Sequence, residues 1–202
     1  MIGIVDYGAG NLKSVGKAFD FLGFESRLVD GPAGLEGLDR LVLPGVGAFG
    51  EAARQLRARG LFSPLQDWIE ADRPFLGICL GLQLLFGSSE ESPGEPGFAA
   101  FPGVCRKLGA RKVPQIGWNT VRVGGGSAAT ALFEDIPDAS YFYFVHSYYV
   151  DPEDPDLIGA LTDHGGPYPS IAGRSRIVGV QFHPEKSGAL GLRLLANWVG
   201  RC

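Results

Sequence analysis

Short apolar runs alternate with amphipathic segments through the first half of the chain. Apolar runs bounded by turn residues indicate buried strands, and apolar positions that recur roughly every three to four residues indicate helices with one apolar face. This pattern predicts strands at residues 2–6, 24–29, 41–43 and 75–78, and helices at 12–22, 50–59, 64–71 and 80–86. Asn11 stands where its side chain can cap the first helix. Alternating strands and helices indicate a parallel sheet that is covered on both faces.

The second half of the chain consists mainly of β-like runs separated by turn residues. The runs predict strands at residues 104–108, 118–123, 141–150, 157–162, 169–173 and 177–182, followed by a helix at 190–199. Residues 87–102 are rich in Ser, Glu, Pro and Gly and are expected to form an exposed loop. We predict an α/β fold in one domain spanning residues 1–202. Its doubly wound, mostly parallel sheet is flanked by helices and carries extra antiparallel strands in the C-terminal half.

Composition and charge narrow the functional classes. The chain has 202 residues, of which 45% are hydrophobic and 20% charged, and this is ordinary globular composition. The formal net charge is -4, without a block of like charges. Nucleic-acid-binding proteins usually present a basic face, so we do not expect nucleic acid as the partner.

The cysteines and the apolar segments indicate the cellular compartment in which the protein is expected. Cys79, Cys105 and Cys202 are too widely spaced for a disulfide framework or a zinc site. The start of the chain lacks the basic segment and long apolar run of a signal peptide. The longest uncharged apolar stretch, residues 74–87, is shorter than the roughly 20 residues that span a bilayer. We therefore expect a reduced cytoplasmic protein with no membrane association, no metal and no cofactor.

A candidate nucleophile lies where a predicted strand passes into a helix. Cys79 is flanked by Gly77 and Gly81, in the arrangement of a nucleophile elbow with cysteine in place of serine. The helix that follows presents unpaired N–H groups and the positive end of its dipole, which favour a thiolate. The N–H of Leu80 can then donate to an oxyanion. A small buried cysteine with only a packing role fits the same local pattern.

A candidate base comes later in the chain. His183 ends an apolar run and is followed by Pro184 and Glu185, and residues two apart in an extended segment face the same side. Glu185 can therefore orient the ring of His183 and stabilise its protonated form. His164 lies in a Gly-rich loop and is expected to be solvated. For His146, within an aromatic strand, a packed histidine is at least as good an interpretation as a chemical role.

Two nucleotide-binding patterns are incomplete. Gly8 and Gly10 follow a strand, but Lys13 stands where the third glycine of G-x-G-x-x-G belongs. The segment from Gly10 to Gly16 and Lys17 has one residue too many for a P-loop and lacks the Ser or Thr that binds magnesium. We reject both interpretations.

Several blocks of the sequence resemble one family. Cys79 within Gly-Ile-Cys-Leu-Gly-Leu-Gln and His183-Pro-Glu185 resemble the class I, triad-type glutamine amidotransferases. A closer resemblance, to the glutaminase subunits of imidazole glycerol phosphate synthases, covers essentially the whole chain. It rests on Asp6-Tyr-Gly-Ala-Gly-Asn-Leu-Lys-Ser14, Pro44-Gly-Val-Gly-Ala-Phe49, Gly117-Trp-Asn119, Tyr143-Phe-Val-His-Ser-Tyr-Tyr149 and Phe182-His-Pro-Glu-Lys-Ser187. Small departures are Gln115, where many relatives have histidine, and Leu82, where methionine is common.

This resemblance implies a mechanism and site residues. Cys79 would attack the side-chain amide of glutamine, His183 would protonate the departing ammonia, and Glu185 would orient His183. Water would then cleave the glutamyl thioester. The resemblance also implies glutamine contacts and an oxyanion hole. The glutamine contacts would be Gly45, Gly47, Gln83, Ser147 and Tyr148, and the oxyanion groups Val46 and Leu80.

The resemblance also implies a partner. Ammonia would pass to a separate (β/α)₈-barrel cyclase subunit of a heterodimer in histidine biosynthesis. Trp118, Tyr143 and Lys186 match positions at or near that interface, although solvated or packed residues fit these positions equally well.

The family pattern leaves other functions and one further expectation open. Another Cys-His hydrolase on this fold, such as a different glutaminase or a peptidase, is one alternative, and a binding subunit without turnover is a second. Because Gly45 and Gly47 lack a Cβ, the peptide of the loop between them can flip easily. We expect the oxyanion hole to be incomplete until the loaded partner binds.

Overall fold

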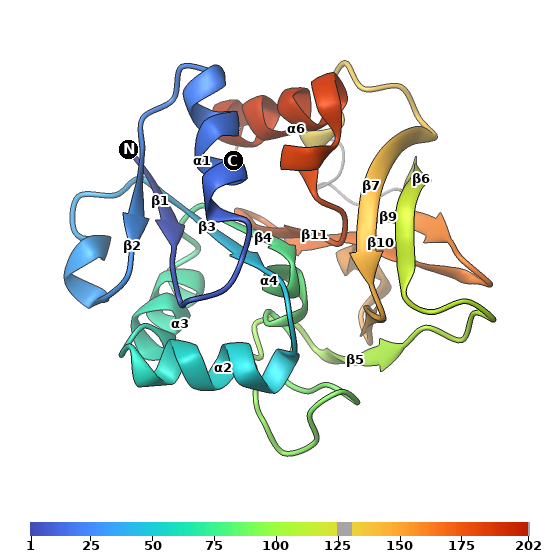
Figure 1. Cartoon of the computed structure of the whole chain (residues 1–202), viewed down its shortest axis with the longest axis horizontal. Helices are drawn as coiled ribbons and strands as arrows, with labels where there is room; N and C mark the ends of the chain where they lie inside the picture. The colour runs from blue at the N-terminus through green and yellow to red at the C-terminus, as the bar shows by residue number, and fades with distance from the viewer. Residues whose placement is uncertain (125–130, 202) are drawn as a thin grey trace.

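The computed structural model describes residues 1–124 and 131–201 of the chain. Figure 1 shows a central sheet with helices on both sides. The strands are β1 Ile2–Val5, β2 Ser26–Val29, β3 Arg40–Gly45, β4 Phe75–Cys79, β5 Gly103–Lys107, β6 Gln115–Val123, β7 Ser140–His146, β8 Tyr148–Pro152, β9 Ile158–Asp163, β10 Pro167–Arg174 and β11 Ile177–Val180. The helices are α1 Leu12–Phe21, α2 Phe49–Ala58, α3 Phe62–Glu70, α4 Leu80–Gln83 and α6 Gly188–Arg201, with short 3₁₀ turns at Pro32–Leu35, Pro155–Leu157 and Pro184–Lys186.

The large sheet combines a parallel and an antiparallel half. Within the described residues its strand order is β2-β1-β3-β4-β11-β10-β9-β6-β7. The pairs from β2 to β11 are parallel, and those from β11 to β7 are antiparallel. The predicted antiparallel strands of the C-terminal half therefore extend one edge of the parallel sheet. Strands β5 and β8 pair separately as a small antiparallel sheet.

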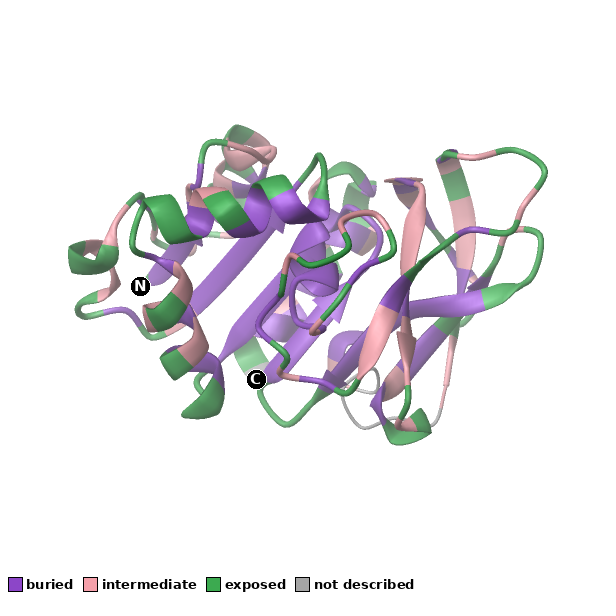
Figure 2. Cartoon of the chain, turned by 90° about the horizontal axis from the view of Figure 1, so that it is seen from below, coloured by how far each residue is buried: buried purple, intermediate pink, exposed green. Residues whose placement is uncertain are grey.

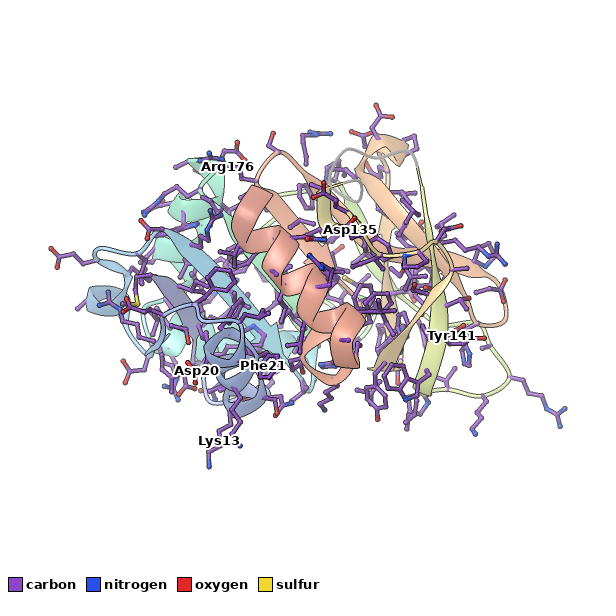
Figure 3. All side chains as sticks on the ribbon, turned by 90° about the horizontal axis from the view of Figure 1, so that it is seen from above. Lys13, Asp20, Phe21, Asp135, Tyr141 and Arg176 are labelled. Carbon is purple, nitrogen blue, oxygen red and sulfur yellow. The ribbon has the colours of Figure 1, made fainter. Side chains whose placement is uncertain are left out.

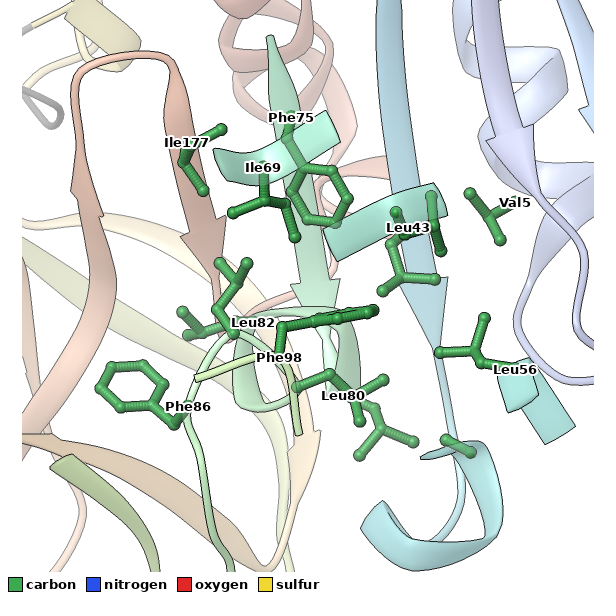
Figure 4. Close-up of a cluster of buried hydrophobic side chains, with 14 of the residues drawn as sticks. Val5, Leu43, Leu56, Ile69, Phe75, Leu80, Leu82, Phe86, Phe98 and Ile177 are labelled. Carbon is green, nitrogen blue, oxygen red and sulfur yellow. The ribbon is translucent and has the colours of Figure 1, made fainter. Parts of the chain in front are cut away.

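Successive side chains of the parallel strands point to opposite faces of the sheet and pack into two different hydrophobic cores. Leu41 and Leu43 of β3 face α2 and α3, whereas Val42 between them faces α1 and α6. Figure 4 shows part of the first core, in which Phe98 lies between Phe75 and Leu80. Figure 2 shows the result, with buried strands between helices whose outer faces are exposed. This alternation explains why the inner strands β1, β3, β4 and β11 are almost entirely apolar, since each one is covered on both faces, whereas the edge strand β2 is partly exposed.

Three segments differ from the sequence-based prediction. The helix expected at residues 80–86 is the short α4, which ends at Gln83 and continues as turns. The strand expected at 141–150 is broken into β7 and β8, because Ser147 lies at a change of direction between two different sheets. Periodicity alone does not detect such a break, since both halves are equally β-like.

The third difference concerns residues 87–102, which are less exposed than predicted. Phe98 and Phe101 are buried, and Phe101 forms a β-bridge with Phe86. Ser89 is also buried and bridges to Cys105. The loop is therefore anchored on the core by its few apolar residues, although its composition is polar overall.

The sequence predicts no membrane-spanning segment. Among the helices of the described residues, none combines the length and the apolar character needed to cross a bilayer.

Candidate active site

Cys79 lies on a strained turn between β4 and α4. Its backbone has φ 55° and ψ −106°, in the region of positive φ that non-glycine residues rarely adopt. The two flanking glycines permit this turn. A Cβ on Gly77 would lie 2.5 Å from the carbonyl group of Gly81, and a Cβ on Gly81 would collide with the carbonyl oxygen of Leu43. The glycine pattern therefore reflects tight packing of the elbow against β3, and strain of this kind is typical of functional sites.

The parallel register brings the predicted site residues to one edge of the sheet. Gly45 at the end of β3 lies opposite Cys79 at the end of β4, and Ile78 lies opposite Val180 at the end of β11. His183 follows β11 by three residues. Since the carboxyl ends of adjacent parallel strands meet at one edge, residues far apart in sequence converge there.

His183 and Glu185 form the predicted pair. Nδ1 of His183 lies 3.0 Å from Oε1 of Glu185, and both side chains are almost completely buried. Asn11 also reaches this carboxylate, because its Nδ2 donates to the same oxygen at 3.4 Å. Asn11 was predicted to cap α1 with its side chain. It occupies the N-cap position but makes no side-chain capping bond, so its amide contacts Glu185 instead.

The surroundings of His183 favour its protonated form. Burial opposes the charge and is the largest single effect, but interactions with Cys79 and Glu185 outweigh it and raise the pKa of His183 to about 9. Nε2 of His183 is buried and has no partner within ordinary hydrogen-bond geometry among the described residues. Because Cys79 raises the pKa of His183, the two side chains must lie close together. The distance or the alignment between Cys79 and Nε2 of His183 nevertheless falls outside that of a hydrogen bond.

Gln181 is a neighbour of Cys79 that the sequence analysis missed. It is fully buried, and its Nε2 lies 3.6 Å from Sγ of Cys79. Its Oε1 accepts from Nε2 of Gln83 at 3.2 Å, and the same nitrogen of Gln83 donates to the carbonyl of Tyr148 at 2.8 Å. A sequence signal existed, because Gln181 precedes His183 by two residues and a polar residue in an otherwise apolar run needs a partner.

A cavity of about 240 Å³ opens beside Cys79. Seven of the predicted site residues line it. They are Val46, Gly47, Cys79, Leu80, Gln83, Ser147 and Tyr148. Ser147 and Tyr148 lie where β7 ends and β8 begins, so the break between these strands forms part of the cavity wall.

Gly45, His183 and Glu185 are not among the residues that line this cavity. A Cβ on Gly45 would lie 2.5 Å from the hydroxyl of Tyr7 and 2.8 Å from Cβ of Leu80, so glycine here permits close packing under the elbow. Gly47 differs, because it has φ 104° and open space where a Cβ would lie. Its glycine is required by the backbone conformation.

Glu91 is a second lining residue that sequence reasoning missed. Its carboxylate lies at the cavity and accepts from the backbone N–H of Phe49 at 2.7 Å. Ser92 accepts from the N–H of Gly50 at 3.0 Å, so the loop supplies the cap that Ala48 cannot give to α2. No local pattern signals this contact, because 42 residues separate cap and helix.

The two other histidines have structural partners. His146 is buried, with Nδ1 2.8 Å from the carbonyl of Tyr148 and Nε2 3.2 Å from the hydroxyl of Tyr168. Burial is the main cause that lowers the pKa of His146 to about 4, so the ring is neutral at pH 7. His164 is half-buried, and its Nε2 lies 2.8 Å from the carbonyl of Lys112, so it is less solvated than expected.

The three predicted interface residues form one surface cluster. Trp118 is 56% exposed and its ring meets Tyr143 edge-on at 6.2 Å, while Nζ of Lys186 lies 5.7 Å from the Tyr143 ring centre. Ile116 and Tyr141 are also exposed, and Figure 3 shows Tyr141 beside strand β6. Strand register places all the hydrophobic members on one face of the β6–β7 pair.

Within the described residues no group of three or more His, Cys, Asp or Glu side chains could hold a metal ion. Cys79 and Cys105 are both free thiols, and Cys202 lies outside the described residues.

Comparison with known proteins identifies the family. A family model described as class-I glutamine amidotransferase matches residues 4–201. The chain belongs to the class I glutamine amidotransferase family. Among curated members, the imidazole glycerol phosphate synthase subunit HisH of Desulfitobacterium hafniense is 46% identical, over 98% of this chain and 95% of its own. That of Symbiobacterium thermophilum is 48% identical, over 96% and 91%. These relatives confirm the glutamine amidotransferase assignment and the resemblance to this synthase subunit.

Two solved structures share the fold of this chain. A crystal structure of a glutamine amidotransferase has a TM-score of 0.77 at 17% identity and covers 98% of this chain and 97% of its own. PurLQS from Thermotoga maritima has a TM-score of 0.73 at 15% identity, with the same coverage. This likeness concerns the fold alone, and it confirms the predicted α/β fold class.

Proposed function

We propose that this chain, acting as one glutamine amidotransferase domain over residues 1–202, releases ammonia from glutamine through a thioester on Cys79. One observation carries the proposal. Cys79 sits on a strained elbow at the wall of a cavity, and it interacts with His183 of the buried His183–Glu185 pair. A nucleophile next to a base that is itself oriented by a carboxylate is the arrangement that covalent acyl transfer requires.

The reaction follows from these positions. The thiolate of Cys79 attacks the side-chain carbonyl carbon of glutamine, and the N–H groups of Leu80 and Val46 stabilise the resulting oxyanion. Protonated His183 gives its proton to the amide nitrogen, the C–N bond breaks, and ammonia leaves a glutamyl thioester. His183, now neutral, takes a proton from water, which attacks the thioester to give glutamate and regenerate the thiolate. The raised pKa of His183 supports its role as the proton donor.

The remaining cavity residues fit the amino-acid end of glutamine. Gln83, Ser147 and Tyr148 line the cavity with polar groups, and Gly47 leaves open backbone at its mouth. Glu91 is the acidic side chain among the lining residues, and it supplies the negative charge that the α-ammonium group of the substrate needs. Gly45 contributes by letting the elbow and the loop pack closely.

The ammonia is delivered to a partner, which we propose to be a (β/α)₈-barrel cyclase subunit in the cytoplasm. The HisH relatives are named as subunits of imidazole glycerol phosphate synthase, which supports a heterodimer for histidine biosynthesis. The docking surface is the cluster of Trp118, Tyr143 and Lys186. It is joined to the proposed base, because the N–H of His183 donates to the carbonyl of Tyr143 at 2.9 Å.

Activation by the partner follows from the oxyanion loop. Gly47 adopts positive φ in open space beside the exposed Val46, so the peptide between them can rotate with little steric cost. The loaded partner then completes the oxyanion hole. The isolated chain is expected to hydrolyse glutamine slowly, with strong activation by the cyclase and its nucleotide substrate, whereas full activity of the isolated chain would contradict this step.

The function is tested with Cys79→Ala and His183→Ala in the complex with the cyclase. Both variants should abolish glutamine-dependent synthesis and retain synthesis from added ammonium, because only ammonia release is lost. Labelling of Cys79 by an electrophilic glutamine analogue provides a direct readout in the wild type. Hydrolysis of peptides but not of glutamine, or inertness of Cys79 toward the analogue, would overturn the proposal.

A further inference from the structure

Gln181 and Gln83 form a chain of buried amides that ends on the nucleophile. Gln181 follows β11, is 0% exposed, and is held by a backbone hydrogen bond from its N–H to the carbonyl of Ser170 at 2.9 Å. Gln83, on α4, is 4% exposed. Both glutamine side chains are buried away from solvent, so their amide atoms need hydrogen-bond partners within the protein. Each unpaired amide atom would carry a desolvation cost.

The backbone determines which end of Gln181 faces Cys79. The carbonyl of Tyr148 can only accept, so the atom of Gln83 that lies 2.8 Å from it is the NH₂ group. That NH₂ group lies 3.2 Å from the side chain of Gln181, which must present its oxygen there. The nitrogen of Gln181 is then the atom 3.6 Å from Sγ of Cys79. The order of donors and acceptors therefore follows from one fixed carbonyl and does not depend on an arbitrary amide orientation.

Two groups at Sγ favour opposite protonation states of Cys79. The carbonyl of Val145 lies 3.8 Å from Sγ and can accept from the thiol, which favours the neutral form. The N–H of Gln181 can only donate, and a thiolate is a far better acceptor than a thiol. Because Gln181 is completely buried, its hydrogen bond to a charged sulfur is not weakened by competing water.

We propose that Gln181 is a further catalytic residue, which donates a hydrogen bond to the Cys79 thiolate and is oriented for this by Gln83. The inference rests on the proposed function, in which the thiolate attacks glutamine and is regenerated when the thioester is cleaved. Gln181 stabilises the sulfur anion at both points. Gln83 lines the cavity as well, so the substrate-facing wall and the donor to the nucleophile belong to one hydrogen-bonded unit.

Gln181→Met and Gln181→Glu test the donor in the isolated full-length chain. Methionine has a similar size and no N–H, while glutamate keeps the shape and places a carboxylate beside the sulfur. The rate of Cys79 alkylation by iodoacetamide is measured from pH 5 to pH 9. At pH 6 we expect a loss of about tenfold for Gln181→Met and a larger loss for Gln181→Glu. Both profiles should shift to higher pH, whereas a packing defect alone would leave the pH dependence in place.

Other titrating groups near Cys79 are the same in every variant. His183 lies behind it, while His146 lines the cavity and is neutral above pH about 4. Tyr7 and Tyr168 also interact with Cys79, but burial raises the pKa of both phenols beyond the range of the experiment. Differences between the profiles therefore report on Gln181.

Asn197→Leu is the matched control. Asn197 is a buried amide on α6 that donates to the carbonyls of Leu132 and Glu134, away from Cys79. This variant should lose stability and keep the wild-type alkylation profile. Folded Gln181→Met protein with an unchanged profile would overturn the inference. If wild-type protein is alkylated as expected but does not hydrolyse glutamine with any partner, the proposed function fails while the hydrogen bond stands.

A measurement on the wild type avoids dependence on folding of the variants. The side-chain NH₂ resonances of Gln181, followed by NMR across the same pH range, should shift as Cys79 ionises. The shift should be absent in Cys79→Ala. Resonances that do not respond in the wild type would overturn the inference even if both Gln181 variants fail to fold.

Discussion

Glu185 illustrates how one buried residue sets the protonation state of another. Its Oε1 lies 3.0 Å from Nδ1 of His183, and Asn11 donates to the same oxygen at 3.4 Å. Burial alone would lower the pKa of His183, whereas Cys79 and Glu185 raise it to about 9. The proposed proton donor is therefore charged at neutral pH although little water reaches it.

Glu185→Gln should move the alkaline limit of glutaminase activity toward neutral pH. In the wild type, activity falls as His183 loses its proton near pH 9, and removal of the Glu185 charge lowers the pKa of His183. The profile of kcat/KM between pH 6 and pH 10, measured with the cyclase present, checks this. Glu153→Gln serves as the control, because Glu153 is exposed and its replacement should leave the alkaline limit unchanged. Uniform loss of activity without a shifted limit would mean that Glu185 does not tune His183.

His146 should limit stability at acid pH. Its pKa is lowered to about 4 in the folded chain, against about 6.5 when unfolded. Between these values the unfolded chain binds a proton that the folded chain excludes. Stability contributed by neutral His146 is therefore present above pH 6.5 and is lost as the pH falls to 4, by up to about 3 kcal/mol. Urea unfolding at several pH values should give a smaller acid loss for His146→Gln, and an equal slope would contradict this assignment.

The elbow between β4 and α4 shows how an element depends on its neighbours. Gly81 allows α4 to begin directly against β3, where the carbonyl of Leu43 occupies the position of the missing Cβ. The strained φ of Cys79 is kept by this packing. The short helix, the strand end and the proposed nucleophile therefore form one unit.

Gly81→Ala should destabilise the fold by about 3 kcal/mol, because the backbone of β3 cannot move away cheaply. Cys79 alkylation should slow as well, since the elbow must shift. Thermal unfolding and alkylation rates measure the two effects. Gly31→Ala is the matched control, because Gly31 is extended and has no atom within 4 Å of the added methyl group. Equal stability of both variants would show that the elbow tolerates a side chain.

At the scale of the molecule, the two edges of the large sheet differ in their surroundings. The β6–β7 edge carries Trp118 and Tyr143, and Lys186 of the 3₁₀ turn Pro184–Lys186 lies against Tyr143, close to the proposed base. The opposite edge strand, β2, carries the exposed Leu28 far from the cavity. Exposed aromatic residues on one such edge are typical of binding surfaces.

Trp118→Ala should weaken cyclase binding at least about tenfold, as expected for an exposed aromatic residue that becomes buried against a partner. Slow glutamine hydrolysis by the isolated chain should remain, because Trp118 does not line the cavity. Titration of glutaminase activation against cyclase concentration measures the affinity. Leu28→Ala is the control and should bind normally. If both variants bind like the wild type, the partner docks elsewhere.

The sequence by itself determined the fold class, the family and the residues nearest the chemistry. Apolar periodicity located the strands. One short motif contains the proposed nucleophile, Cys79, and a second contains the proposed base, His183, together with its carboxylate, Glu185. Such features are local, because a strand, an elbow or a His-Pro-Glu turn is encoded by adjacent residues.

Only the tertiary structure decided how distant polar groups meet. Gln181 reaches Cys79 and Gln83, and Glu91 caps α2 across 42 residues. Asn11 stays at the N-cap position of α1, but its side chain donates to Glu185 and does not cap the helix. The same holds for the break at Ser147, where one apparent strand enters two sheets. A buried polar side chain must find a partner, but its sequence neighbourhood does not specify which one, since that choice depends on strands and loops brought together by folding.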